Sequence, residues 1–151
     1  MGSEMCIRDR FGPAQDPDQF SLVTRLVHAA VHGKPPDLEN LFSANAEDAW
    51  PLLYIKDMAR AIALLQTVEK LHYNVYNVCP EKVTPNLELV DTIKRVIPQF
   101  RIDLPPGHGP FPPMPLTEMK RLQEDTGFIP KFDLQSALQD YVGWLRAGNP
   151  K

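Results

Sequence analysis

The stretch Tyr54-Ile55-Lys56-Asp57-Met58-Ala59-Arg60-Ala61 begins an amphipathic helix and decides the fold assignment. An aspartate at the start of a helix accepts hydrogen bonds from the free N–H groups of the first turn, so Asp57 is predicted to cap this helix. The polar face carries Arg60, Gln66 and Lys70. Apolar side chains recur at helical spacing on the opposite face, at Met58, Ala61, Ile62, Leu65 and Val68.

The chain before this helix is predicted to contain a turn, a second helix and a loop. Phe11-Gly12-Pro13 favours a turn, and Asp16-Pro17-Asp18 is typical of a helix start. Gly33, followed by prolines, ends the helix, and residues 38–50 are predicted as a loop with one short strand. The apolar positions of the helix are Phe20, Val23, Val27, Ala30 and Val31.

Two strands and a third helix are predicted after residue 70. Residues 73–79 are rich in β-branched and aromatic side chains and end at Pro80, which predicts a strand. Residues 101–104 are a second candidate strand. Thr84 ahead of Pro85 predicts an N-cap with proline at the first helical position. The buried stripe of that helix is predicted at Leu87, Val90, Ile93 and Ile97.

The last third of the chain combines a stiff loop with two helices. Prolines fix φ throughout residues 105–115, so this loop is predicted to be extended. A helix over 117–126 ends at Gly127, and Asp133 is predicted to cap the final helix. That helix carries its apolar residues at Leu134, Ala137, Leu138, Tyr141, Val142 and Leu145. Two strands cannot cover these helices from both sides, so we expect exposed apolar stripes and marginal stability.

Composition excludes several classes of function. The chain has 151 residues, 43% of them hydrophobic and 23% charged, as in an ordinary soluble domain. A net charge of −3 favours neither nucleic acid nor an anionic membrane. No apolar run is long enough for a transmembrane helix. The default expectation is therefore a cytoplasmic protein whose partner is a small molecule.

The first ten residues differ from the rest. Residues 1–10 lack the apolar region of a signal peptide and have no helical or strand period. Met-Cys-Ile-Arg-Asp-Arg at residues 5–10 looks like a translated sequencing adapter, and the alternative is a genuine strand end. We therefore assign residues 1–10 as an artefact or disordered, and residues 11–151 as the folded part.

No catalytic or metal-binding constellation is visible among the residues. His28 and His32 lie four residues apart on one helix, but a third ligand is missing, so they are expected to flank the apolar stripe. The two cysteines, Cys6 and Cys79, form no Cys-x-x-Cys pair, and Cys79 is expected to be a small buried hydrophobe. We therefore expect this chain to contain no catalytic, cofactor-binding or metal site.

Four segments together carry a family pattern. Phe11-Gly12-Pro13 is similar to a Tyr-Gly-Pro turn, and residues 54–61 are similar to an aspartate-capped helix with an Ala-Arg-Ala signature. Residues 75–78, Val-Tyr-Asn-Val, resemble an edge strand. Residues 126–130 and 141–145 are similar to a closing Leu-Gly-Trp-x-Pro and a final helix. In this order they resemble the C-terminal half of the extended short-chain dehydrogenase/reductase family, the NAD-dependent epimerases and dehydratases.

The resemblance implies an α/β fold: the C-terminal portion of a Rossmann-like doubly wound fold with its small, mostly helical substrate-binding lobe. It also implies features that this sequence lacks. The family binds NAD or NADP through a glycine-rich turn, and no two of the 8 glycines here are three residues apart. The family's Tyr-x-x-x-Lys pair is also missing, because none of the 4 tyrosines is followed by a lysine at that spacing.

The substrate side is the part that the resemblance assigns to this chain. Gly12 and Pro13 are implied to lie near the mouth of the active site, and His108 is a candidate polar contact. Members that act on nucleotide sugars often carry an arginine seven residues before the aspartate, where this chain has Trp50. A diphosphate substrate is therefore in doubt.

The leading hypothesis is a fragment of an NAD(P)-dependent epimerase, dehydratase or related oxidoreductase that acts on a sugar-like or other hydroxylated substrate. The fragment itself is expected to be inactive and to bind no cofactor, and the parent protein is a candidate homodimer. One alternative is a non-catalytic binding or sensor protein derived from the same family. The other is a self-standing helical interaction module.

Overall fold

The computed structural model describes residues 10–16, 21–41, 44–112 and 114–149. It confirms an α/β chain in which helices predominate. In chain order the elements are β1 (Arg10–Phe11), α2 (Leu22–His32), β2 (Ala49–Trp50), β3 (Leu53–Tyr54), α3 (Ile55–Thr67), β4 (Thr84–Pro85), α4 (Asn86–Val96), α5 (Lys120–Thr126) and α6 (Leu134–Arg146).

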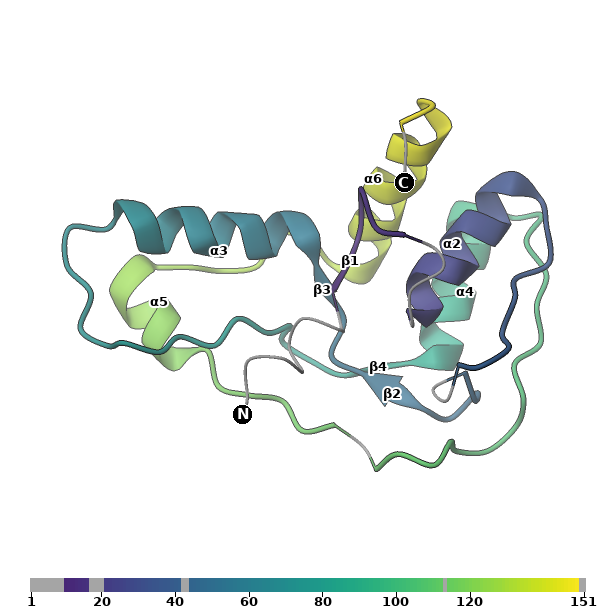
Figure 1. The fold of residues 1–151 in the computed structure, drawn as a ribbon, viewed down its shortest axis with the longest axis horizontal. Helices are drawn as coiled ribbons and strands as arrows, with labels where there is room; N and C mark the ends of the chain where they lie inside the picture. The colour runs from purple at the N-terminus through teal and green to yellow at the C-terminus, as the bar shows by residue number, and fades with distance from the viewer. Residues whose placement is uncertain (1–9, 17–20, 42–43, 113, 150–151) are drawn as a thin grey trace.

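The helices form two groups with the short strands between them (Figure 1). In one group α4 and α2 pack against α6 and against each other, while in the other α3 packs against α5. The first group contains the main core, whose fully buried side chains include Leu26, Val27, Ile93, Ile97, Leu138 and Tyr141. The second group, which we call the lobe, has a small core of its own at Ala61, Cys79, Met119, Leu122 and Phe128.

The strands contribute only two short pairings. β1 pairs with β3 in parallel, with Phe11 opposite Tyr54. β2 pairs with β4 in antiparallel orientation, with Trp50 opposite Thr84. Each strand has two residues, so the helices supply most of the packing. The short strand expected within residues 38–50 is confirmed as β2.

Helix α2 begins later than the sequence predicts. Its N-cap is Ser21, whose side chain accepts a hydrogen bond from the backbone N–H of Thr24, so the start predicted at Asp16-Pro17-Asp18 is wrong. The Ser21 hydroxyl is the cap because it lies directly before the first helical turn. Gly33 ends the helix in the left-handed conformation, with φ of 63°, as expected. Phe20 lies outside the described residues.

Helix α4 also begins differently, because Thr84 and Pro85 form β4 and the helix starts at Asn86. The predicted N-cap role of Thr84 is therefore wrong. Pairing with β2 holds this dipeptide extended, and the Asn86 N–H donates to the Asp48 carbonyl oxygen at 2.8 Å. A tertiary acceptor thus replaces the predicted side-chain cap at the start of the helix.

Neither of the two longer strands predicted from β propensity forms. Residues 73–79 and 101–104 contain no strand. A strand needs a partner ladder as well as suitable side chains, and no described segment supplies one here. Ile102 and Leu104 instead pack as half-buried side chains against the main core.

The predicted apolar stripes are only partly buried. On α3 Ala61 is fully buried, but Ile62 is 48% exposed. On α4 Val90 and Ile93 are buried as predicted, as is Ile97 at its C-cap, whereas Leu87 is 54% exposed and Leu89 is buried instead. The exposed apolar surface expected from the sequence is therefore confirmed on both helices.

The last two helices follow the prediction closely. α5 begins at Lys120, three residues after the predicted start, and Gly127 ends it with φ of 66°. Asp133 caps α6, because its carboxylate accepts a hydrogen bond from the Ser136 N–H at 2.7 Å. Residues 105–112 and 114–115 form no helix or strand, and bends at residues 106–107 and 110–111 interrupt the extended course predicted for this loop.

Two remaining expectations concern the N-terminus and membranes. Of the segment assigned as an artefact, residues 1–9 lie outside the described residues, and Arg10 pairs with Leu53 in β1. None of the helices in the described ranges is long and apolar enough to cross a bilayer.

Ile93→Ala tests the packing of α4. Ile93 is 1% exposed within the main core, so the truncation leaves a cavity and is expected to lower the free energy of unfolding by about 2–5 kcal/mol. Urea denaturation measures this change. Leu87→Ala on the exposed face of the same helix is the matched control, and equal losses for the two variants would contradict the described packing.

Candidate functional site

The Gly12-Pro13 turn packs directly on the start of α3. Both residues are buried, and Gly12 has φ of 142°, which side chains rarely allow. A Cβ on Gly12 would lie 2.6 Å from Cγ2 of Ile55 and 2.8 Å from Cε2 of Tyr54. The backbone of the turn after β1 therefore approaches the start of α3 at a distance that only glycine permits, which places this turn at the junction of the two helix groups.

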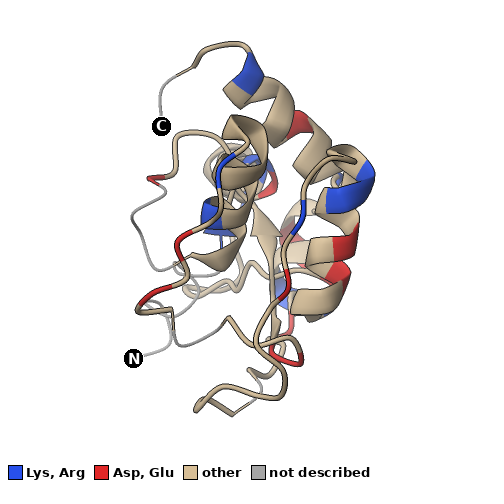
Figure 2. Ribbon diagram, turned by 90° about the vertical axis from the view of Figure 1, so that its right-hand side faces the viewer, with Lys and Arg blue, Asp and Glu red and all other residues tan. Residues whose placement is uncertain are grey.

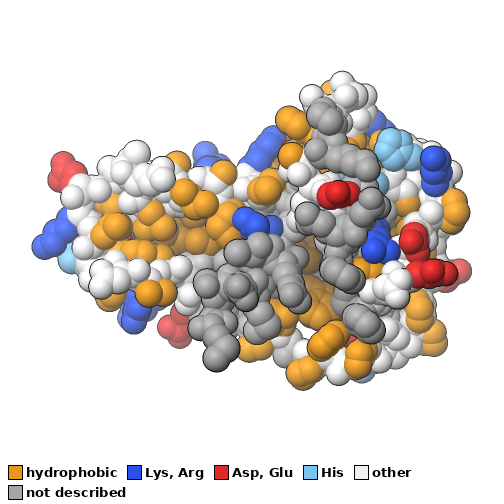
Figure 3. Space-filling view, viewed as in Figure 1, with side chains coloured by type: hydrophobic (Ala, Val, Ile, Leu, Met, Phe, Trp, Pro, Cys, Tyr) orange, Lys and Arg blue, Asp and Glu red, His pale blue; other side chains and the backbone are white. Residues whose placement is uncertain are grey.

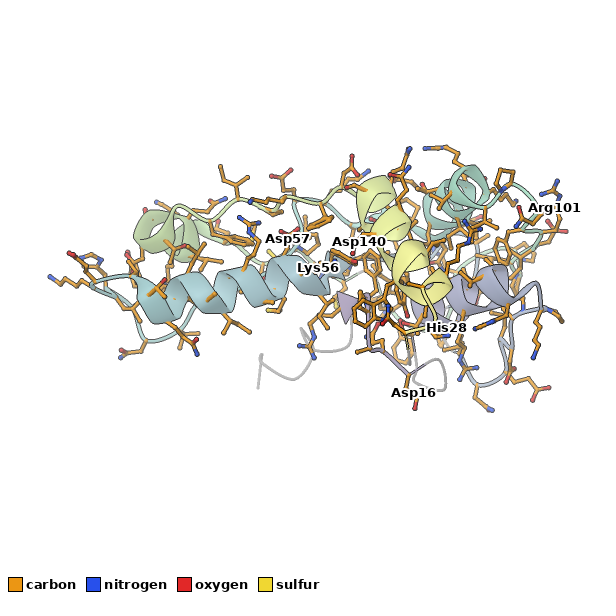
Figure 4. The ribbon with its side chains drawn as sticks, turned by 90° about the horizontal axis from the view of Figure 1, so that it is seen from above. Asp16, His28, Lys56, Asp57, Arg101 and Asp140 are labelled. Carbon is orange, nitrogen blue, oxygen red and sulfur yellow. The ribbon has the colours of Figure 1, made fainter. Side chains whose placement is uncertain are left out.

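Tyr54 joins the start of α3 to α6. Its hydroxyl donates a hydrogen bond to Asp140, and Lys56 Nζ lies 2.6 Å from Asp140 Oδ2 (Figure 4). Burial, followed by the hydrogen bond to Asp140, raises the pKa of Tyr54 far above its ordinary value. Burial alone would raise the pKa of Asp140, but hydrogen bonds from Lys56 and Tyr54 outweigh it, so that pKa is lowered. The Tyr54 phenol therefore keeps its proton at neutral pH and acts as a donor.

Asp57 does not cap its helix, so this sequence prediction is wrong. The N-cap of α3 is Tyr54, and Asp57 lies within the first turn, 1% exposed. Its carboxylate accepts hydrogen bonds from the backbone N–H groups of Lys131 and Phe132 at 2.9 and 3.0 Å. Arg60 Nη1 donates to the same carboxylate at 2.8 Å. The helix starts two residues before Asp57, so this side chain is free to bind the segment that leads into α6.

His108 lies against two carboxylates. Its Nε2 is 3.1 Å from Oε2 of Glu47, and its Nδ1 is 4.0 Å from Oδ1 of Asp48. Asp48 is buried and accepts a hydrogen bond from the Gly109 N–H at 2.8 Å. The Pro105 carbonyl oxygen also accepts a hydrogen bond from the Ala46 N–H, at 2.8 Å. The loop with His108 is thus bound to residues 45–48, and its imidazole faces acidic groups.

The histidines of α2 have different environments. His28 is buried, and its Nε2 lies 3.0 Å from the hydroxyl of Tyr141. His32 is exposed, with its ring centroid 6.1 Å from that of His28. Within the described ranges no three His, Cys, Asp or Glu side chains are grouped to hold a metal ion. Cys79 is buried as expected, and its Sγ lies 2.7 Å from the Thr117 carbonyl oxygen.

Charge is distributed without a single dominant sign. Figure 2 shows acidic and basic side chains interspersed along the helices. This pattern agrees with the net charge of −3 and differs from the continuous basic surface of a nucleic-acid-binding protein.

Solved structures share this arrangement over nearly the whole chain. The dTDP-glucose 4,6-dehydratase of Bacillus anthracis, solved with NAD, is 21% identical, covers 91% of this chain and has a TM-score of 0.69. The UDP-glucuronic acid 4-epimerase of Bacillus cereus, also with NAD, is 15% identical over 93% with a TM-score of 0.72. The UDP-glucose 4-epimerase of Thermotoga maritima, with UDP-glucose, is 19% identical over 93% with a TM-score of 0.70.

The fold therefore corresponds to part of the Rossmann-like fold of these three enzymes. The chain spans 42%, 44% and 43% of the dehydratase, the UDP-glucose epimerase and the UDP-glucuronic acid epimerase, respectively. The TM-scores of 0.69 to 0.72, over 91–93% of this chain, confirm the predicted resemblance in fold. No protein-family model and no curated protein matches the sequence.

Within this fold, the sequence-predicted site residues lie at two places. Gly12, Pro13 and Asp57 belong to the junction at the start of α3, whereas His108 is held beside Glu47 and Asp48. Sequence reasoning missed Asp140 and Asp48, because neither belongs to a recognisable motif. Their partners at Tyr54 and Gly109 are 86 and 61 residues away in the chain, so local spacing carries no signal for them.

Gly12→Ala tests the close approach of the turn to α3. The new methyl group would overlap Ile55 and Tyr54, and the positive φ adds strain, so we expect the free energy of unfolding to fall by about 1–3 kcal/mol. Thermal unfolding followed by circular dichroism measures the change. Gly143→Ala is the control, because open space surrounds that position in α6 and alanine favours a helix. A Tm unchanged by Gly12→Ala would contradict the described junction.

Asp57→Ala tests the buried carboxylate. Without it, the N–H groups of Lys131 and Phe132 lose their acceptor, which is expected to cost about 1–3 kcal/mol of unfolding free energy. Asp91→Ala, at an exposed acidic position on α4, controls for the loss of a charge. Chemical denaturation of both variants decides the matter, and a loss no larger than that of the control would show that Asp57 does not hold this segment.

Proposed function

We propose that this chain forms the substrate-side part of an NAD(P)-dependent epimerase, dehydratase or related oxidoreductase. The observation that carries the proposal is the shared fold: 91–93% of the chain superposes on enzymes solved with NAD or with a UDP-sugar, over 42–44% of their length. In the complete enzyme, a hydride would move between the substrate and the nicotinamide. The remaining part of the fold would supply the cofactor site and the acid/base residue.

The described residues do not fit a dinucleotide. A pyrophosphate binds where a glycine-rich turn exposes the free N–H groups of a helix N-terminus. Here Ser21 and Asp133 cap α2 and α6 with their own side chains. Asp57 and Glu88 place carboxylates in the first turns of α3 and α4, which would repel a phosphate. We therefore assign no cofactor-holding role, and no reaction step through the cofactor, to the residues of this chain.

The substrate proposed for the enzyme is a sugar-like or other hydroxylated small molecule. Gly12 and Pro13 are proposed to shape the mouth of the site, and His108 to supply a polar contact. A diphosphate would require cationic partners, whereas the groups around His108 are the carboxylates of Glu47 and Asp48. Trp50, at the position of the family's arginine, is uncharged. These features favour a substrate whose recognition at this loop does not depend on a diphosphate.

The proposal predicts different cofactor binding by the 151-residue chain and by the product of its gene extended upstream of Phe11. Extension is expected to reveal a glycine-rich turn and a Tyr-x-x-x-Lys pair. The extended protein should then bind NAD(P)H and transfer hydride, and the 151-residue chain should do neither. Titration followed by nicotinamide fluorescence measures binding, and absorbance measures hydride transfer.

Three results would contradict this function. Micromolar binding of NAD(P)H by the 151-residue chain would show that it holds a cofactor site. A glycine-rich turn without the Tyr-x-x-x-Lys pair would favour the non-catalytic binding or sensor protein. Absence of both motifs, together with cooperative unfolding of a monomeric 151-residue chain, would favour the self-standing helical module.

A further inference from the structure

The turn that follows β1 has a strained backbone. Gly12 has φ of 142° and Ala14 has φ of 62°, and a residue with a Cβ atom is energetically unfavourable in this left-handed region. Backbone strain persists only where the surrounding structure holds it, and it is concentrated at binding and active sites. The conformation of this turn therefore depends on supporting contacts, which the structure shows on two sides.

Helix α2 supports the turn on one side, through the side chain of Gln15. Nε2 of Gln15 donates a hydrogen bond to the Arg10 carbonyl oxygen at 2.6 Å. The hydroxyl of Thr24, a fully buried residue, donates to Oε1 of the same amide at 2.8 Å. The Gln15 amide therefore spans the turn and joins it to α2 through residues that are near one another in the chain.

The ring of Tyr54 supports the turn on the other side. Tyr54 is 2% exposed, and its Cε2 atom would lie 2.8 Å from a Cβ on Gly12, so the ring and the turn are in direct contact. The ring of Phe11, the last residue of β1, also packs on it, with centroids 5.4 Å apart. Because protein interiors are close-packed, a movement of the Tyr54 ring would move the turn with it.

Asp140 of α6 fixes the Tyr54 ring through a directional contact. The Tyr54 hydroxyl donates a hydrogen bond to the Asp140 carboxylate, whose two oxygens lie 2.6 and 2.8 Å from Nζ of Lys56 (Figure 4). A charged acceptor makes this hydrogen bond stronger than a bond between neutral groups. Phe132 also packs on the ring, with centroids 4.8 Å apart, but an apolar contact has no preferred direction. The Asp140 carboxylate therefore determines how far the ring reaches toward α6.

Burial of apolar surface holds α3 to the lobe and does not by itself fix its start on α6. Within the lobe α3 packs against α5, and Ala61 belongs to the lobe core. Further along the helix Ile62 is 48% exposed, and Figure 3 shows hydrophobic side chains gathered at the surface over α3. The polar contacts of Asp140 therefore carry much of the connection between the start of α3 and α6.

We propose that Asp140 is a positioning residue for the mouth of the substrate site: through the Tyr54 hydroxyl it holds the Gly12–Pro13 turn in its strained conformation. This inference rests on the proposed function, which gives the turn its place at the mouth. Asp140 lies 86 residues from Tyr54 in the chain and acts on the turn only through that ring. It has no part in the chemical step.

NMR of the 151-residue chain with isotope-labelled glycine tests the inference. The Gly12 signal is the one that is missing from the spectrum of Gly12→Ala. Asp140→Ala should shift this signal and make the buried Gly12 amide exchange at least about tenfold faster, with the far-UV circular dichroism retained. The Gly33 signal, at the end of α2, is the internal reference and should stay in place. Gln139→Ala, at the neighbouring exposed position of α6, is the matched control.

Two further variants show whether Asp140 acts through Tyr54. Asp140→Asn keeps an oxygen that accepts the Tyr54 hydroxyl but loses the charge that pairs with Lys56, so it should retain the Gly12 signal of the unaltered chain. Tyr54→Phe should reproduce the effect of Asp140→Ala. Combining Tyr54→Phe with Asp140→Ala should add nothing, because both changes remove the same hydrogen bond. A general loss of stability would instead give effects that add.

The protein encoded by the gene extended upstream of Phe11 supplies a second readout. Asp140→Ala should leave its affinity for NAD(P)H unchanged, because the proposed cofactor site is built by the remaining part of the fold. Titration followed by nicotinamide fluorescence measures this affinity. A fall in affinity together with the change at Gly12 would show general damage to the fold and would overturn the positioning role.

The remaining outcomes separate this inference from the proposed function. If Asp140→Ala leaves the Gly12 signal in place, or if Asp140→Asn moves it as far as Asp140→Ala does, the positioning role is overturned while the proposed function stands. If the extended protein binds no NAD(P)H although the Gly12 signal responds as expected, the proposed function fails. Asp140 then still positions the turn, but the turn is not the mouth of an oxidoreductase site.

Discussion

The buried carboxylate of Asp57 holds together parts of the molecule that are far apart in the chain. It accepts the N–H groups of Lys131 and Phe132, and so fixes the segment between α5 and α6 on the first turn of α3. Phe132 then packs on Tyr54, with ring centroids 4.8 Å apart, and Tyr54 in turn donates to Asp140 of α6. The lobe and the main core therefore meet at the start of α3, and the Gly12 turn packs on the same residues.

This junction explains the chemical character of the chain. Its polar groups are used in internal hydrogen bonds: Asp57 binds backbone N–H groups, and Asp140 binds Tyr54 and Lys56. Groups held in this way position the helices against one another. The role proposed above, on the substrate side of an oxidoreductase whose reactive groups come from the remainder of the fold, fits that chemistry.

The sequence alone predicts several features of the site, but it does not predict others. The turn at Gly12 is visible from Phe11-Gly12-Pro13, and the importance of Asp57 follows from its place at the start of an amphipathic helix. The partners of Asp57 do not follow from the sequence, because Lys131 lies 74 residues away and offers only a backbone N–H. His108 was singled out as a polar residue in a proline-rich loop, but its carboxylate neighbours became visible only when residues 45–48 were placed beside it.

The sequence by itself determined the elements whose stabilising partners are near in the chain. The period of α6, its Asp133 cap and the left-handed glycines at 33 and 127 depend on residues within one or two turns, so local pattern was enough. Only the tertiary structure decided the rest. Residues 73–79 have strand-forming side chains but no ladder in the described chain, and Thr84 became part of a strand because β2 lies beside it. A backbone hydrogen bond needs a second segment at a defined position, and local sequence does not specify where the chain will bring one.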